Sequence, residues 1–482
     1  MKIFNSLSRK KEELKTLKKG KLNIYVCGMT VYDDCHIGHA RTFLSFDMIV
    51  RYLRSRNIEV NYIRNITDVD DKILRRAKET NQEPSVLTDR YIERMTSDFN
   101  ALGMISPDKE PRATENIQII LDLISRLIEG GYAYHEGGDV YFSVESFPEY
   151  GKLSNQKMDE ILSGARIEID KEKRNPADFV LWKKGYGNLA WDSPWGKGRP
   201  GWHIECSAMS MDALGETFDI HAGGSDLKFP HHENEIAQSE AATGNNFVKY
   251  WMHTGPLRID KEKMSKSLDN FLTIRDALKD YPYEVLRFFL LSSHYRSPIN
   301  YSEEAVVESK AALERLYTAI HNVDISLIDE LYKGVHTGQF QEAMDDDFNV
   351  PEALSVLFDL AKTINKSKEN GDIEKARVLT TELINLSNSL GLLEQDPEIF
   401  LKSGVGMNES EVQVLISERE KARDAGNYSK ADEIRDQLLE KNIILEDSKE
   451  GTFWRRRSLN SKVFSNVPTV AAIISSLLRF FC

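Results

Sequence analysis

Two histidines near the start of the chain form the first group of side chains that could do chemistry. His36 and His39 are three residues apart with Gly38 between them, and a helix-like segment follows at 40–56. Amides at a helix N-terminus favour anions, and imidazoles can donate hydrogen bonds to phosphate oxygens as charge develops. The pattern predicts a phosphate-binding surface, with helix capping or packing as the alternative role of each histidine.

A second candidate lies much later, in the run Lys263-Met-Ser-Lys266-Ser. Two lysines that bracket small hydroxyl-bearing residues suit a polyphosphate, because the amines neutralise charge and the hydroxyls donate hydrogen bonds. An ordinary solvated loop is the alternative.

Four side chains of the metal-ligand type are spread over three further segments. Cys27 ends a predicted strand, Cys206 lies in GWHIECSAM, and His231 and Glu235 are four residues apart, hence on one face of a predicted helix. Two thiolates, an imidazole and a carboxylate form a competent tetrahedral zinc set. Because the gaps between them are long, buried free cysteines remain the alternative.

The elements that must position these residues alternate between strands and helices. A first strand, loop, helix, strand and further helix are expected at 22–27, 28–39, 40–56, 59–66 and from about 71. This order is a βαβ unit and implies a parallel sheet. A strand, loop and helix return at 218–221, 222–228 and 230–242, after a stretch at about 108–202 that we predict to be an insertion.

The second half of the chain is predicted to be helical. Apolar residues from Ala376 to Leu390 recur at helical spacing, which indicates a bundle over 301–400. A smaller unit is expected at 401–457, beginning with a charged helix. The tail at 458–482 receives no function, and its apolar run is too short to span a membrane.

Composition limits the function classes. The 482 residues are 41% hydrophobic and 29% charged, which excludes collagen-like, disordered and membrane-embedded proteins. The net charge of −13 argues against non-specific coating of nucleic acid, although a local basic strip could still bind one. Four cysteines give no disulfide framework, so Cys35 and Cys482 are expected to be free thiols. We predict a cytoplasmic protein, since no signal-peptide-like segment is present, and a monomer, since the sequence has no obvious dimerisation stripe.

Taken together, the motifs resemble the class I aminoacyl-tRNA synthetases and, within them, the cysteinyl-tRNA synthetase family. The matching segments occur in order: CGMTVYDDCHIGHAR, GWHIECSAM, FDIHAGGSDLKFPHHENEIAQ, KMSKSLDN and LEDSKEGTFWRR. The resemblance implies an α/β fold with a Rossmann-like parallel-sheet catalytic domain over 1–300, an all-α helical bundle over 301–400 and an anticodon-binding domain over 401–457.

The same resemblance implies roles for the candidate residues. His36, Gly38 and His39 would contact the phosphates of ATP, and Lys263 and Lys266 would stabilise the transition state of adenylate formation. Cysteine would be joined to AMP, with Mg²⁺ assisting, and then transferred to the 3′ end of tRNA(Cys).

In this family the zinc ligands fall on Cys27, Cys206, His231 and Glu235, and zinc binds the thiol of the substrate. A soft, thiolate-bound zinc prefers a further thiolate to a hydroxyl, which would separate cysteine from serine. The amino-acid pocket or the adenylate site is expected to include Thr67, Trp202, His221 and Asp226. Contacts with tRNA are expected from Arg419, Arg423, Asp432, Arg435, Asp447 and Trp454.

Three alternatives remain. An ATP-dependent ligase that joins cysteine to an aminosugar resembles the same catalytic half, but it lacks a full anticodon-binding unit. A zinc hydrolase that uses the HxxxE pair would not need the lysine loop. A non-catalytic RNA-binding relative could have lost either phosphate motif, whereas both are intact in this sequence.

Overall fold

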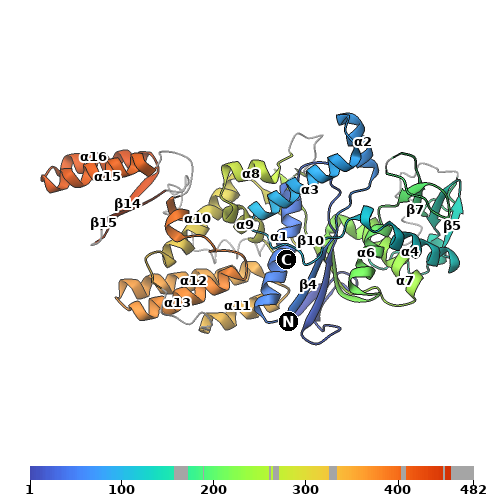
Figure 1. Ribbon diagram of the computed structural model, residues 1–482. Helices are drawn as coiled ribbons and strands as arrows, with labels where there is room; N and C mark the ends of the chain where they lie inside the picture. The colour runs from blue at the N-terminus through green and yellow to red at the C-terminus, as the bar shows by residue number, and fades with distance from the viewer. Residues whose placement is uncertain are drawn as a thin grey trace. The chain divides into compact units, whose positions relative to one another are not determined.

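The computed structural model describes residues 1–156, 172–187, 189–259, 262–263, 271–324, 334–402, 409–448 and 451–456. Figure 1 shows it as a ribbon. Its contacts divide the chain into two units, the first Met1–Pro256 with Arg296–Pro298, the second Leu257–Tyr295 with Ile299–Cys482. Lys266, Cys482 and the tail at 458–482 lie outside the described residues.

A four-stranded parallel sheet forms the centre of the first unit. Its order is β10-β9-β3-β4, from β3 (Lys21–Val26), β4 (Glu59–Arg64), β9 (Phe218–Gly224) and β10 (Val248–Thr254). Strands β3 and β9 are neighbours in the sheet. From β3 the chain continues to β4 on one side, and from β9 it continues to β10 on the other side. In open α/β sheets, ligands bind beyond the carboxyl ends of the strands at such a switch point. The parallel sheet confirms the predicted α/β fold class.

Helix α1 (Ile37–Ser55) follows β3 and is buried on all sides along its middle, where every residue from Phe43 to Val50 is buried. The apolar pattern predicted that this helix would start at residue 40. It starts at Ile37 instead, because His36 is its N-cap. After β4 come α2 (Asp71–Thr80), capped by the Asp70 side chain, and α3 (Pro84–Ala101). The carboxyl ends of β3 and β4 therefore both lead directly into capped helices.

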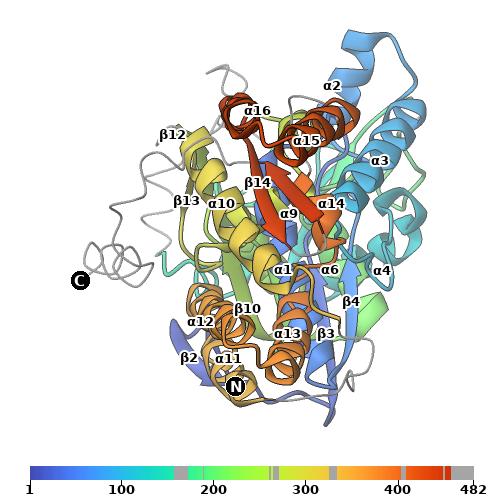
Figure 2. The same cartoon turned by 90° about the vertical axis from the view of Figure 1, so that its left-hand side faces the viewer.

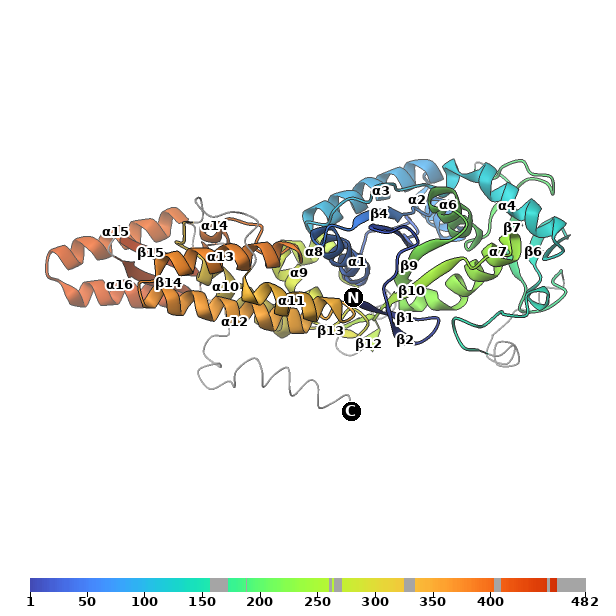
Figure 3. The same ribbon diagram turned by 90° about the horizontal axis from the view of Figure 1, so that it is seen from below.

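A second sheet occupies much of the region predicted to be an insertion. Its four antiparallel strands are β5 (Ala133–Glu136), β6 (Asp139–Phe142), β7 (Phe179–Lys184) and β8 (Gly198–Pro200). Its apolar side shares a core with α4 (Ile117–Glu129), α6 (Ile204–Leu214) and α7 (Glu233–Thr243), three helices that pack together (Figures 1 and 3).

Shorter elements complete the first unit. The strands β1 (Lys2–Asn5) and β2 (Lys10–Glu13) form a hairpin beside β10, which the sequence analysis did not predict. The short helical segments are η1 (Ala113–Glu115), η2 (Val144–Ser146), η3 (Ser225–Leu227) and η4 (Lys228–His232). The last of these runs directly into α7 and carries His231.

The second unit is mainly helical. It begins with a small sheet of β11 (Leu257–Ile259), β12 (Glu262–Lys263) and β13 (Ile299–Tyr301). Its helices are α8 (Ile274–Asp280), α9 (Tyr283–Leu291), α10 (Glu303–Ile320), α11 (Val335–Asp345), α12 (Val350–Glu369), α13 (Ile373–Asn388) and α14 (Pro397–Lys402). Helices α11, α12 and α13 pack side by side (Figure 2), with the apolar stripe of α13 turned inward.

The last described segment forms a small body with its own hydrophobic core. Two antiparallel helices, α15 (Glu409–Asp424) and α16 (Tyr428–Glu440), pack against the hairpin of β14 (Ile443–Ser448) and β15 (Gly451–Arg456). Trp454 lies in the core between them and is 2% exposed. Among the helices of the described part of the chain, none is long and apolar enough to cross a membrane.

Candidate active site

The four candidate metal ligands come together at the carboxyl end of the central sheet. Cys27 follows β3, Cys206 lies in α6, and His231 and Glu235 come from η4 and α7; all four are buried. Cys27 Sγ lies 3.7 Å from Cys206 Sγ. It lies 3.5 Å from His231 Nε2 and 3.5 Å from Glu235 Oε1, and those two atoms are 3.0 Å apart.

These separations match the edges of a zinc tetrahedron. Zinc–sulfur distances of about 2.3 Å and zinc–nitrogen or zinc–oxygen distances of about 2.1 Å give tetrahedral edges of about 3.8 Å between two sulfurs, about 3.6 Å between sulfur and a lighter donor, and about 3.4 Å between nitrogen and oxygen. The three distances from Cys27 fall within about 0.1 Å of these values, and the imidazole–carboxylate distance is somewhat shorter. The donor set therefore fits zinc both in chemistry and in spacing.

Neighbouring groups fix the orientation of two of these donors. His203 Nδ1 lies 2.9 Å from Nδ1 of His231, which leaves Nε2 of His231 turned toward the two sulfurs. His221 Nε2 lies 2.7 Å from the second carboxylate oxygen of Glu235. Such contacts to the far side of a ligand hold its orientation. The sequence analysis did not single out His203, although it stands in the same GWHIEC segment as Cys206.

A second group of donors, Cys27, His221, His232 and Glu235, also lies close together among the described residues. It fits a tetrahedron less well, since His221 already forms a short hydrogen bond with Glu235, and His232 Nε2 is 4.0 Å from the nearer carboxylate oxygen. His232 instead bonds His253, at 2.8 Å. His232 thus lies in a buried hydrogen-bond network.

Electrostatics in the cluster favour the charged forms of Cys206 and Glu235, whereas burial raises the pKa of the Cys27 thiol well above its usual range. A hydrogen bond from Cys27 lowers the pKa of Cys206 to about 6, although burial opposes this. Burial opposes the charged form of Glu235 too, but the nearby His221 and His231 hold the pKa of that carboxyl well below its usual range. Thiolate and carboxylate are the forms that bind a metal.

The two motif histidines cap helix α1 and each other. His36 Nδ1 accepts a hydrogen bond from the backbone N–H of His39 at 3.2 Å, and His39 Nδ1 accepts one from the N–H of His36 at 3.3 Å. The rings stack with centroids 3.6 Å apart. Burial lowers the pKa of His36 to about 4 and holds that of His39 well below its usual value, so both are neutral at pH 7.

This arrangement fixes the tautomer of both rings. A neutral imidazole whose Nδ1 accepts must carry its hydrogen on Nε2. Both His36 and His39 therefore present an Nε2–H donor at the N-terminus of a helix, together with the amide of Gly38 in its first turn. The structure thus supports capping by both rings, and the same geometry leaves each ring a donor suited to phosphate.

The other predicted pocket residues occupy different surroundings. Thr67 is buried beyond β4 and pairs with the loop after β3, while Asp226 is exposed on η3 and close enough to His36 to raise its pKa against the effect of burial. His221 is fully buried and faces Glu235, so it lies against the donor cluster. Trp202 is 39% exposed, and its ring lies 4.5 Å from that of His231.

Lys263, the first lysine of the second motif, belongs to the second unit. Lys263 ends β12, whose backbone pairs with β11 at Arg258. Lys266 lies outside the described residues, so its predicted role remains a prediction.

The predicted tRNA contacts divide into buried and exposed residues. Arg419 is buried and forms a bidentate ion pair with Asp447, at 2.7 and 2.9 Å. Trp454 belongs to the core and so packs there instead of offering a face to a base. Arg423, Asp432 and Arg435 are exposed.

The structure adds one aromatic residue on this small body that the sequence analysis missed. Tyr428, the first residue of α16, is 67% exposed. The only sequence signal for this residue was an aromatic side chain directly after Gly426-Asn427, a pair typical of turns.

Comparison with known proteins agrees with this site. The family described as "tRNA synthetases class I (C) catalytic domain" matches residues 13–311, a DALR domain matches 339–394, and a "Cysteinyl-tRNA ligase anticodon binding domain" matches 409–455. A methionyl-tRNA synthetase from Mycobacterium tuberculosis, in complex with methionyl-adenylate, has the same fold with a TM-score of 0.56. It is 15% identical and covers 79% of this chain and 91% of its own. The fold and its site define a class I aminoacyl-tRNA synthetase.

The closer relatives narrow the class to one family. A cysteine–tRNA ligase of Hahella chejuensis is 55% identical over 95% of this chain and 100% of its own length. One from Legionella pneumophila (strain Corby) is 55% identical over 94% of this chain and 99% of its own. The chain belongs to the cysteine–tRNA ligase family and is a ligase of that class. The match to an anticodon-binding domain argues against the alternative of a ligase that joins cysteine to an aminosugar, because such a ligase lacks a full anticodon-binding unit.

Proposed function

We propose that this protein activates L-cysteine with ATP and transfers it to the 3′ end of tRNA(Cys). The observation that carries the proposal is the buried set of Cys27, Cys206, His231 and Glu235, whose spacing suits zinc, at the switch point of a class I synthetase fold. Cysteine–tRNA ligases that match nearly the whole chain support the same substrate.

These four residues would hold a zinc ion, which when bound prefers a thiolate ligand to a hydroxyl and so supplies the selection of cysteine over serine. Around them the protein excludes water, since all four donors are buried. Trp202 closes one side of this site, and Thr67 and Asp226 are the polar groups proposed to face the rest of the amino acid or the adenylate.

The first step joins cysteine to AMP. A carboxylate oxygen of cysteine attacks the α-phosphorus of ATP, supplied as its Mg²⁺ complex, and the bond to the bridging oxygen breaks so that pyrophosphate leaves. Such phosphoryl transfer depends mainly on positioning and charge stabilisation. His36 and His39 would donate their Nε2–H groups to phosphate oxygens, with the Gly38 amide beside them. Lys263 and Lys266 would neutralise the charge that develops on the departing phosphates.

The second step passes cysteine to tRNA. A hydroxyl of the terminal ribose attacks the adenylate carbonyl, and AMP leaves with the bonding electrons. The C-terminal body at 401–457 would read the anticodon, and its exposed side chains, Arg423, Asp432 and Arg435, are the proposed contacts, together with the Arg419–Asp447 pair. Trp454 would act only as part of the core.

Cysteine-dependent exchange of labelled pyrophosphate into ATP tests the first step without tRNA. We expect exchange with cysteine and at least about 10⁴-fold less with serine, the discrimination reached by sites built around a specific polar contact of the substrate. Exchange that does not depend on cysteine, or that is equal with serine, would contradict the proposal.

A further inference from the structure

A strongly basic surface lies on the N-terminal hairpin and the loop that follows it. The first 21 residues carry eight basic and only two acidic side chains, whereas the whole chain has a net charge of −13. All eight basic side chains are exposed, and we call them the basic strip: Lys2, Arg9, Lys10, Lys11, Lys15, Lys18, Lys19 and Lys21. None of the steps proposed above uses this surface.

The backbone that carries the basic strip is held by hydrogen bonds to the central sheet. Strands β1 and β2 pair beside β10 (Figure 3). In the loop after β2, the N–H of Leu17 donates to the buried carboxylate of Asp219 at 2.6 Å. The hydroxyl of Tyr250 accepts from the N–H of Lys15 at 3.0 Å and donates to the Glu13 carbonyl at 2.9 Å. The basic side chains therefore project from an ordered backbone, so that less backbone entropy is lost when a ligand binds.

Acidic side chains nearby compensate only part of this positive charge. Glu13 pairs with Lys15 at 3.4 Å, and all four side chains of this pair and of the pair formed by Lys21 and Glu59 at 2.7 Å are more than half exposed. Ion pairs this exposed are weak. Among the described residues, no carboxylate pairs with the other five unengaged cations of the strip: Lys2, Arg9, Lys10, Lys18 and Lys19.

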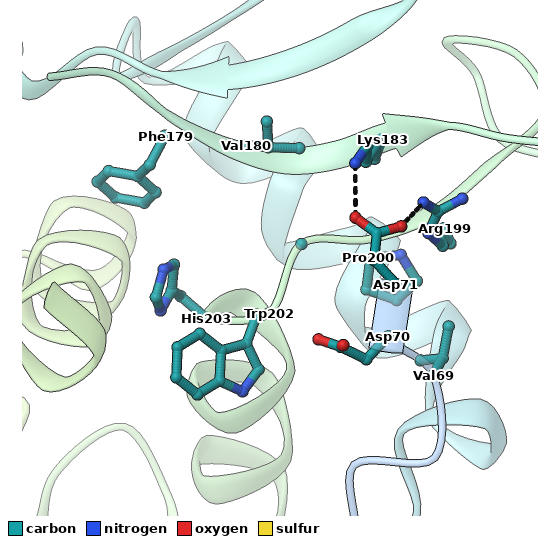
Figure 4. A pocket seen from close by; sticks show the side chains of 11 residues that line it. Val69, Asp70, Asp71, Phe179, Val180, Lys183, Arg199, Pro200, Trp202 and His203 are labelled. Atoms are coloured by element: carbon teal, nitrogen blue, oxygen red, sulfur yellow. Dashed lines mark hydrogen bonds and ion pairs between the residues drawn. The ribbon is translucent and has the colours of Figure 1, made fainter. Parts of the chain in front are cut away.

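A pocket elsewhere in the first unit shows the contrasting arrangement. There Lys183 and Arg199 both face the carboxylate of Asp71, and Lys183 Nζ lies 2.6 Å from Asp71 Oδ2 (Figure 4). Beside the basic strip the effect is opposite: burial lowers the pKa of Lys228, and the positive charge of Arg9 lowers it further. The strip therefore keeps a positive field that attracts anions.

The side chains of the strip favour the phosphates of a nucleic-acid duplex over other polyanions. Proteins hold single strands with aromatic side chains that stack on the bases, and they bind membrane surfaces with apolar side chains beside the basic ones. Within residues 1–21, all of which the structure describes, Leu17 is the only large apolar side chain that is exposed. Lysine and arginine without such neighbours suit phosphate oxygens, which position a protein without specifying sequence.

The strip reaches the edge of the central sheet that lies opposite the candidate active site. Lys18 and Lys19 come just before β3, at the amino end of the parallel strands. The cluster of four donors lies beyond the carboxyl ends of the same strands. A ligand held by these lysines therefore does not occupy the candidate active site.

We propose that the basic strip binds the phosphate backbone of double-stranded RNA without reading its sequence, at a surface separate from the one that activates and transfers cysteine. RNA is the nucleic acid that the proposed function brings to this protein, so the choice of RNA rests on that function. A-form RNA is recognised mainly by its shape and by contacts to phosphates and ribose hydroxyls, which such a strip can supply. The overall charge of −13 confines this binding to the strip.

Titration of a labelled RNA duplex of about 20 base pairs at several salt concentrations tests the proposal. We expect a Kd between about 10⁻⁴ and 10⁻⁶ M near physiological salt, and a slope of log K against log salt between about −4 and −5, since each phosphate contact contributes about −0.9. The double variant Lys18→Ala/Lys19→Ala should bind about tenfold more weakly, with a slope smaller by about 2. The matched double variant Lys362→Ala/Lys366→Ala removes the same charge from exposed positions of α12 and should bind like wild type.

Two results would overturn the assignment of the strip. One is an unchanged affinity and salt slope in Lys18→Ala/Lys19→Ala, or an equal loss in both double variants. The other is binding of a single-stranded RNA of the same length, or of vesicles of phosphatidylserine and phosphatidylcholine, that exceeds duplex binding and is lost in Lys18→Ala/Lys19→Ala.

Pyrophosphate exchange on the same preparations separates this inference from the proposed function. We expect Lys18→Ala/Lys19→Ala to show wild-type cysteine-dependent exchange, because these lysines lie away from the candidate active site. Wild-type protein without cysteine-dependent exchange would contradict the proposed function. Normal exchange together with RNA binding that does not depend on the strip would overturn this inference alone.

Discussion

The double role of His36, as cap of α1 and as phosphate donor, can be separated by two substitutions. His36→Asn replaces the capping Nδ1 with a side-chain oxygen at the N-cap, where asparagine is among the best residues, whereas His36→Ala removes the cap. Both substitutions remove the ring that stacks on His39 at 3.6 Å and the Nε2–H donor. Any difference between the two variants therefore reports the cap, and any loss common to both reports the ring.

The expected magnitudes follow from this geometry. The single cap hydrogen bond, from the His39 N–H to His36 Nδ1 at 3.2 Å, is worth about 1 kcal/mol. For a unit of this size that is a difference of about 2 °C in Tm between the alanine and the asparagine variant. Loss of one donor aimed at developing charge slows a reaction by about 10²–10³-fold, and we expect that loss in both.

Thermal melting and cysteine-dependent pyrophosphate exchange are measured side by side. If His36→Asn exchanges as fast as wild type while His36→Ala does not, the imidazole acts only as a cap, and the phosphate role assigned to it is wrong. Equal Tm values for the two variants would show instead that the cap contributes no stability.

Three further predictions follow from the same contacts. Cys206→Ser should lose bound zinc, measured by metal analysis, while Cys35→Ala, which removes an equally buried thiol outside the cluster, should retain it; zinc retained in Cys206→Ser would refute the assigned ligand set. Tyr317→Phe should lower the free energy of unfolding by about 1–3 kcal/mol, because it removes a 2.7 Å hydrogen bond to the buried Glu284 carboxylate; an unchanged denaturant midpoint would contradict this. Tyr428→Ala should raise the KM for tRNA about tenfold, as expected for loss of one stacked base, and leave exchange unaltered, whereas an unchanged KM would exclude this ring as an RNA contact.

Three strands of the central sheet, β3, β4 and β9, could be predicted because their residues carry a strong local signal, whereas β10 was not predicted. The run at 22–26 is almost continuously apolar, as buried parallel strands are, and the helix after it is rich in apolar residues that become buried. The start of α1 was placed too late, since His36 and Ile37 have no apolar periodicity and the helix begins there because of a cap.

Elements with weaker patterns were missed. Strand β2 reads KKEE, and β14 ends in charged residues, so neither shows the alternation of apolar and polar side chains that marks a strand. Their pairing partners stabilise them instead. Trp454 was predicted to contact tRNA because it is aromatic, but only packing between α15, α16 and the β14–β15 hairpin reveals that it is buried.

In the candidate site, too, the residue types could be predicted from the sequence, whereas the geometry could not. Residue types alone suggested Cys27, Cys206, His231 and Glu235 as a metal set, and the family resemblance singled them out. Their mutual distances depend on three segments that meet only in the folded sheet. The ion pair between Lys183 and Asp71 likewise joins residues that are 112 positions apart in the sequence. No local pattern could have indicated that pair.

The most direct test of the account is charging of tRNA(Cys) with labelled cysteine, run beside labelled serine, before and after removal of bound metal. We predict charging with cysteine alone, its loss when a chelator removes the metal, and its return when zinc is added. Charging that survives complete metal removal with its preference for cysteine intact, or comparable charging with serine by the zinc-loaded protein, would contradict the role assigned to the cluster of Cys27, Cys206, His231 and Glu235.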